Sequence, residues 1–179
     1  TYYGLDPGVE EDPEKAATND TDYWAISKYG HDHRTDTTFL FNVWRNGGMS
    51  LRRGLAWAAG KVGKARPNAF LVEDAQAQRW FIQEARDLDI NVSGTKSKGS
   101  KEDRIIQMSA RYESGRVVLV GSVDDWSGAG GKVPHFLSEW CGFPSGSHDD
   151  RLDAMEIGLR GVGGHTVTKS QQDMSDLPL

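Results

Sequence analysis

The 179-residue sequence has a single cysteine, Cys141, and lacks any set of cysteine and histidine residues with the spacing of a zinc site. One cysteine cannot form a disulfide within the chain, so cysteine chemistry is not expected. No apolar run approaches the roughly 20 residues that span a bilayer, and the N-terminal segment lacks the features of a signal peptide. These absences predict a soluble protein.

The phosphate-binding motif GxxxxGK(S/T) is also absent, which argues against ATP hydrolysis through that loop. The length fits one domain with a sizeable core. The chain does not begin with methionine, and we therefore expect a domain cut from a longer protein.

The chain is weakly acidic overall, and its acidic and basic residues are concentrated in separate segments. The formal net charge of −5 argues against a surface coated in basic residues for non-specific nucleic-acid binding. Residues 45–66, however, contain six basic residues and no acid, whereas residues 6–22 contain seven acids and one lysine. Separated zones of this kind could hold a cation in one and a polyanion in the other.

Hydrophobic periodicity predicts a mixed α/β domain. Strands are expected over residues 2–5, 22–30, 37–45, 69–72, 90–93 and 117–120. Helices are expected over residues 50–65, 101–112 and 134–140, and from Ser147 onward. A further helical pattern runs through Ala77, Phe81, Ala85 and Leu88. Loops are expected over residues 7–21 and 124–132. The apolar pattern ends near Gly161, so we predict a domain of residues 1–161 followed by a flexible tail of residues 162–179.

Carboxylates stand at three places where strand or helix ends could converge. They are Asp6, the pair Glu73 and Asp74, and the group Asp149, Asp150 and Asp153. At about 100° per residue, the last three share one side of a helix, away from its apolar stripe. Gathered carboxylates repel one another, so they need protonation or a cation. Oxygen-only ligands favour magnesium or manganese, and two such ions can drive phosphodiester cleavage.

Each acid also has a structural interpretation. Ser147 and Asp150 have the spacing of a capping box, and acids in a first turn favour the helix dipole, so Asp149 and Asp150 could merely start the helix. Asp6 could be a turn residue, and Glu73 an ordinary charge at a strand end. The sequence leaves both interpretations open.

Four motifs carry a family resemblance: GLDPG with a strand at Asp22–Tyr23, FLVED, KEDRII and FPSGSHDDRLDA. Through them, the chain from Tyr3 to about Leu159 resembles the C-terminal nuclease domain of the large terminase subunit of tailed bacteriophages, a member of the ribonuclease H-like superfamily. The resemblance implies a ribonuclease H-like mixed central sheet, with its first three strands antiparallel and helices on its flanks.

The resemblance also implies a metal-dependent endonuclease that cuts concatemeric double-stranded viral DNA during genome packaging, in the host cell cytoplasm. The implied catalytic metal ligands are Asp6, Glu73, Asp149 and Asp150, with Asp153 close enough to assist, and the implied cofactors are two Mg²⁺ or Mn²⁺ ions. Glu73 is preferred to its neighbour because it continues the alternation from Leu71. The implied partners are a packaging ATPase domain of the same full-length chain, the portal and the small terminase subunit.

Basic residues are the candidates for contacting DNA phosphates: Arg52, Arg53, Lys61, Lys64, Lys101 and Arg104. Two alternatives stay open. One is a junction-resolvase-like nuclease of the same fold, which would strongly prefer branched DNA. The other is a non-catalytic DNA-binding or portal-docking module, which would bind DNA without cutting it.

Overall fold

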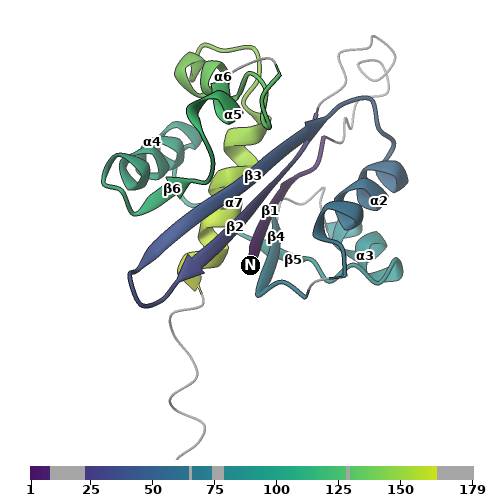
Figure 1. The fold of residues 1–179 in the computed structure, drawn as a ribbon. Coiled ribbons are helices and arrows are strands. Elements are labelled where there is room, and N and C mark those ends of the chain that lie inside the picture. Colours follow the sequence, from purple (N-terminus) through teal and green to yellow (C-terminus); the bar gives the residue numbers. More distant parts are fainter. Residues whose placement is uncertain (9–22, 65, 74–78, 128–129, 165–179) are drawn as a thin grey trace, which may run out of the picture.

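The computed structural model describes residues 1–8, 23–64, 66–73, 79–127 and 130–164 (Figure 1). Its centre is a six-stranded sheet with the strand order β5-β4-β1-β2-β3-β6. The strands are β1 (Tyr2–Asp6), β2 (Trp24–Asp32), β3 (Thr37–Asn46), β4 (Ala69–Glu73), β5 (Ser93–Thr95) and β6 (Val117–Leu119). The helices are α2 (Leu51–Val62), α3 (Arg79–Asp87), α4 (Lys101–Glu113), α5 (Val123–Ser127), α6 (Phe136–Gly142) and α7 (Asp150–Gly164).

The sheet is mixed. Strand β2 runs antiparallel to both β1 and β3, whereas β4, β5 and β6 each run parallel to the strand beside them. This arrangement confirms the predicted α/β class and the predicted antiparallel order of the first three strands. Within the described part of the chain, no helix is long and apolar enough to cross a membrane.

Alternation along β1 sends neighbouring side chains to opposite faces of the sheet. Tyr3 and Leu5 pack in one core cluster with Leu55 of α2, whereas Tyr2 packs in the other with Leu152 of α7. Figure 1 shows α2 and α3 on one side of the sheet and α4 and α7 on the other. By this alternation, Asp6 shares the face of Tyr2, which is the face covered by α7.

Helix α7 lies directly on the backbone of β1. A side chain at Gly4 would overlap the carbonyl oxygen of Ala154 and the backbone nitrogen of Gly158. The hydroxyl of Ser27, on the neighbouring strand, donates a hydrogen bond of 2.7 Å to the same carbonyl of Ala154. Glycine is therefore required at position 4, and β1 and α7 are held at backbone separation. A side chain at Gly158 would instead overlap Ser27 and Tyr29 of β2.

Two predicted elements differ from the structure. The strand expected over residues 90–93 is instead β5, because Val92 turns into the core and the polar edge strand pairs with β4 through its backbone. The first part of the loop expected over residues 124–132 is instead helical and belongs to α5. The Oγ of Ser122 accepts a hydrogen bond from the backbone N–H of Asp125, and the Asp125 carboxylate accepts one from the backbone N–H of Ser122. This capping box starts the helix, and burial of Trp126 anchors it.

Helix α7 and the predicted tail differ from their expected bounds. Helix α7 begins at Asp150 rather than Ser147, and it continues to Gly164, past the expected start of the tail, with Val162 buried in the core. The rest of the predicted tail, most of the 7–21 loop and Asp74 lie outside the described residues, so the tail and the loop stay predictions.

Candidate active site

The site lies where β1 and β4 end, on the face of the sheet covered by α7. The two strands run parallel with Leu5 opposite Val72, so Asp6 and Glu73 follow at adjacent strand ends. Leu71, two residues before Glu73, lies next to Gly161 of α7, which places Glu73 on the same face as Asp6. The structure therefore brings both predicted strand-end acids to one edge of the sheet.

Lys101 holds two of the predicted helix acids. Its Nζ lies 2.6 Å from the Oδ2 of Asp149 and 2.6 Å from the Oδ2 of Asp153. Lys101 is the first residue of α4, and the preceding Ser100 caps this helix by accepting a hydrogen bond of 3.1 Å from the backbone of Asp103. Ser100 and Asp103 have the spacing of a capping box, and this cap fixes the lysine opposite α7.

Asp149 immediately precedes α7 and accepts its first backbone hydrogen bonds. Its carbonyl oxygen accepts the backbone N–H groups of Leu152 and Asp153 at 2.9 and 3.0 Å. Its carboxylate is engaged with Lys101, so a role in starting the helix and a role in the site are compatible for this residue.

Asp150 faces a different set of charges. Its Oδ2 lies 3.6 Å from Nη1 of Arg45 and accepts no hydrogen bond from the described residues. The same Arg45 nitrogen lies 3.1 Å from Glu139, which is buried and also binds Arg151 at 2.7 Å. Sequence reasoning missed Glu139, whose only signal is an acid placed between apolar residues in a short helix. Its effect is to hold Arg45 beside Asp150.

Burial and mutual repulsion perturb the carboxylates. Burial raises the pKa of Asp6 well above its ordinary value, and the nearby charges of Asp153 and Asp150 raise it further. Burial also raises the pKa of Asp153 to about 6, against the opposing effect of Lys101. The pKa of Asp150 is raised as well, again mainly by burial. Asp6 and the acids of α7 thus form one electrostatic cluster that favours an added positive charge.

The donor chemistry of this cluster fits a hard divalent cation, because every candidate ligand is a carboxylate oxygen. As the side chains lie, however, no group of three or more Asp, Glu, His or Cys residues in the described chain is close enough to hold a metal ion. Three of the candidate carboxylates are already engaged by other groups. Lys101 lies between Asp149 and Asp153, and Glu73 accepts a hydrogen bond from the hydroxyl of Ser97. The ammonium group of Lys101 therefore occupies the place between Asp149 and Asp153 that a metal ion would take.

The predicted DNA-contacting residues fall into two groups. Arg52, Arg53, Lys61 and Lys64 belong to α2 and its C-terminal end, so the sheet lies between them and α7 (Figure 1). Arg52 pairs there with Glu84 at 3.6 Å. The sequence shows that this helix is basic but not which face of the sheet it covers. The structure thus does not bring these four residues to the acids.

Lys101 and Arg104 form the second group, on α4, and both contact carboxylates of α7. Lys101 binds Asp149 and Asp153, and Nε of Arg104 lies 3.3 Å from Glu156. The structure therefore brings these two predicted residues to the same side of the sheet as the acids.

Known proteins match this chain in fold but not in sequence. No protein-family model matches the sequence, and no curated protein matches it significantly. Among solved structures, the chain is similar to the large terminase nuclease from thermophilic phage G20c, with a TM-score of 0.56 and 17% identity over 89% of this chain and 80% of that one.

A second similar structure is the large terminase nuclease domain from bacteriophage SPP1, solved with bound Mn, with a TM-score of 0.51 and 12% identity over 89% of this chain and 84% of that one. The G20c nuclease has also been solved with bound cobalt. At these identities the similarity concerns the fold, and it agrees with the fold that the motifs predict. The chain therefore has the ribonuclease H-like fold of the phage large terminase nuclease domains.

Proposed function

We propose that this chain is a metal-dependent endonuclease that hydrolyses phosphodiester bonds in double-stranded DNA. The observation that carries the proposal is the half-buried carboxylate of Asp6, which lies near the acids of α7 at the end of β1 and has its pKa raised by desolvation and by their charges. A cluster of this kind costs folding free energy without a cation, so its presence favours a site built to bind one.

The proposed metal ligands are Asp6, Glu73, Asp149 and Asp150, with Asp153 assisting. Mg²⁺ or Mn²⁺, with two ions expected, would supply Lewis acidity for an attacking water and for the leaving oxygen. The chain's own groups do the rest. Arg45, held by Glu139, keeps Asp150 oriented, and Lys101 offers an ammonium group to a phosphate once it is released from the carboxylates.

The similar structures support the choice of ion and a nuclease activity. The SPP1 domain binds Mn and the G20c nuclease binds cobalt, both divalent metals of the kind that carboxylate oxygens accept. By the same resemblance, we propose that the natural substrate is concatemeric viral DNA cut during genome packaging in the host cytoplasm. A packaging ATPase domain, the portal and the small terminase subunit are the proposed partners.

The test is incubation of supercoiled plasmid with the protein in Mg²⁺, in Mn²⁺ and in chelator. Wild type is compared with Asp6→Asn and with Asp87→Asn, a matched control on the exposed surface of α3. We expect cleavage by wild type and the control only when metal is present, and none by Asp6→Asn although it remains folded by circular dichroism. Undiminished metal-dependent cleavage by Asp6→Asn would refute the proposal.

A four-way DNA junction and a linear duplex of the same sequence extend the test. Comparable cutting of both fits the proposed activity, whereas strong preference for the junction would assign a junction resolvase instead. Binding of DNA without cutting, in Mn²⁺ and with all acids intact, would assign a non-catalytic module.

A further inference from the structure

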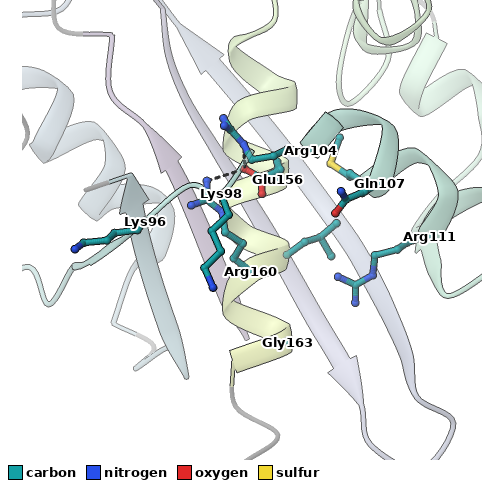
Figure 2. A pocket seen from close by; sticks show the side chains of 10 residues that line it. Lys96, Lys98, Arg104, Gln107, Arg111, Glu156, Arg160 and Gly163 are labelled. Atoms are coloured by element: carbon teal, nitrogen blue, oxygen red, sulfur yellow. Dashed lines mark hydrogen bonds and ion pairs between the residues drawn. The ribbon is translucent and has the colours of Figure 1, made fainter. Parts of the chain in front are cut away.

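A groove of about 380 Å³ lies between α4 and α7, further along α7 than the acids (Figure 2). Its charged lining consists of Lys96, Lys98, Arg104, Arg111, Arg160 and Glu156. Five cations and one carboxylate give the groove a charge of +4, although the whole chain carries −5. Its floor is apolar, since Met108 and Leu159 line it and are each only 3% exposed.

The sign of the charge changes along the two helices. On α7, Asp153 lies at the acid end, whereas Glu156 and Arg160 line the groove, and the three are spaced so that they share one side of the helix. On α4, Lys101 faces the acids, and Arg111 lies ten positions further along. At 1.5 Å per residue, Arg160 lies about 10 Å beyond Asp153 along the helix axis. The acids and the groove thus follow one another along the same two helices.

Glu156 holds two of the arginines in place. Its Oε2 lies 3.3 Å from Nε of Arg104 and 2.6 Å from Nη2 of Arg160. A single carboxylate neutralises only one of these two guanidinium groups, so one positive charge is left over. The side chains are 14% and 19% exposed, and such pre-positioned guanidinium groups lose little entropy when they bind a phosphate.

Lys98 and Arg111 supply charge without a carboxylate partner among the lining residues. Figure 2 shows Lys98 on the same side of the groove as Arg160, and Arg111 across it on α4, whereas Lys96 extends away from the others. The helix positions of Arg104 and Arg111 are about 10 Å apart along α4, which spreads positive charge over more than the width of one phosphate. The groove is therefore suited to several phosphates in a row.

We propose that this groove binds the phosphodiester backbone of the substrate on one side of the cleaved bond. The proposal deepens the proposed function and rests on it for the identity of the polymer. At one phosphate per 3.4 Å of axis on each strand, the distance of about 10 Å corresponds to about three nucleotides. The groove would hold the strand in register while the acids act on the scissile phosphate.

The test measures binding without cleavage. Anisotropy of a fluorescent linear duplex is followed in chelator over a range of salt concentrations. The groove variant is Lys98→Gln with Arg111→Gln. The matched control is Arg34→Gln with Arg86→Gln, which removes the same charge from two exposed residues outside the groove. The groove variant should show a slope of log affinity against log salt that is shallower by about 2, with the control unchanged.

An unchanged slope in the groove variant, an equal loss in the control, or no duplex binding by wild type would overturn the proposal. Free phosphate esters provide a second arm. If wild type binds dAMP and the groove variant does not, while the variant still binds the duplex normally, the groove would be assigned to a mononucleotide instead. Chelator prevents cleavage, so the binding assay and the plasmid assay fail independently. If the groove variant alters the salt slope but wild type does not cut plasmid, only the nuclease proposal is rejected. If wild type cuts plasmid but the groove variant leaves the slope unaltered, only the groove proposal is rejected.

Discussion

Replacing Lys101 with methionine tests whether its ammonium group takes the place of a metal ion. The lysine Nζ lies 2.6 Å from an oxygen of Asp149 and 2.6 Å from an oxygen of Asp153, so these oxygens are at most about 5 Å apart. Methionine has a similar length and no charge. The variant therefore leaves two carboxylates facing each other in the chelated protein.

The size of the effect follows from the distance. Two like charges about 5 Å apart repel by about 3 kcal/mol at an effective dielectric constant of about 20. Since 36% of the Lys101 side chain and 40% of the Asp149 side chain are exposed, solvent screening lowers this to about 1–2 kcal/mol. For a chain of this length, that loss corresponds to a Tm lower by roughly 2–8 °C in chelator.

Metal should reverse the effect. In wild type, Mn²⁺ must displace the ammonium group from two carboxylates, whereas in Lys101→Met the carboxylates are free. Thermal unfolding followed during a Mn²⁺ titration should therefore show a larger stabilisation, at a lower Mn²⁺ concentration, in the variant than in wild type. Lys64→Met, an exposed lysine after α2, is the control and should behave as wild type. Equal Mn²⁺ responses in wild type and Lys101→Met, or no loss of Tm in chelator, would refute the reasoning.

Two further predictions concern folding. Gly4→Ala should destabilise the protein by about 3 kcal/mol in urea denaturation, because the new methyl group overlaps the backbone of α7. The control Gly60→Ala has open space around it and should be neutral or stabilising. Equal effects of the two substitutions would argue against the contact. The folded pKa of about 6 for Asp153 lies above its ordinary 3.8, so the chelated protein should gain stability as pH falls from 7 toward 4, by at most about 3 kcal/mol for this residue. Urea denaturation of Asp153→Asn at the same pH values should show a smaller gain, and an identical pH dependence would contradict the assignment.

Much of the sheet follows from local pattern. The apolar alternation that chooses Glu73 over its neighbour also places Leu71 against α7, and the structure places both side chains on that face. The capping signal at Ser100 and Asp103 locates the start of α4, and thereby Lys101. These features could be predicted because each depends on residues only a few positions apart.

Other features depend on contacts between distant segments. The basic pattern of α2 is visible in the sequence, but the face it covers is set by packing of Leu55 against the β1 side chains. The pairing of Lys101 with Asp149 and Asp153 joins residues that are far apart in the chain. Buried Glu139 joins Arg45 and Arg151 in the same way. No periodicity reports such partners, so they emerge only from the folded arrangement.

The close approach of Gly4 to α7 has a consequence for how substitutions act on this protein. Because no side chain separates β1 from α7 at this point, the spacing between the strand-end acid and the helix acids is set by backbone contact. Changes to core side chains elsewhere should then lower the free energy of unfolding without altering that spacing. The free energy of unfolding and the cleavage rate should consequently vary independently across a library of core variants. The few substitutions that change both should cluster at Gly4 and Gly158.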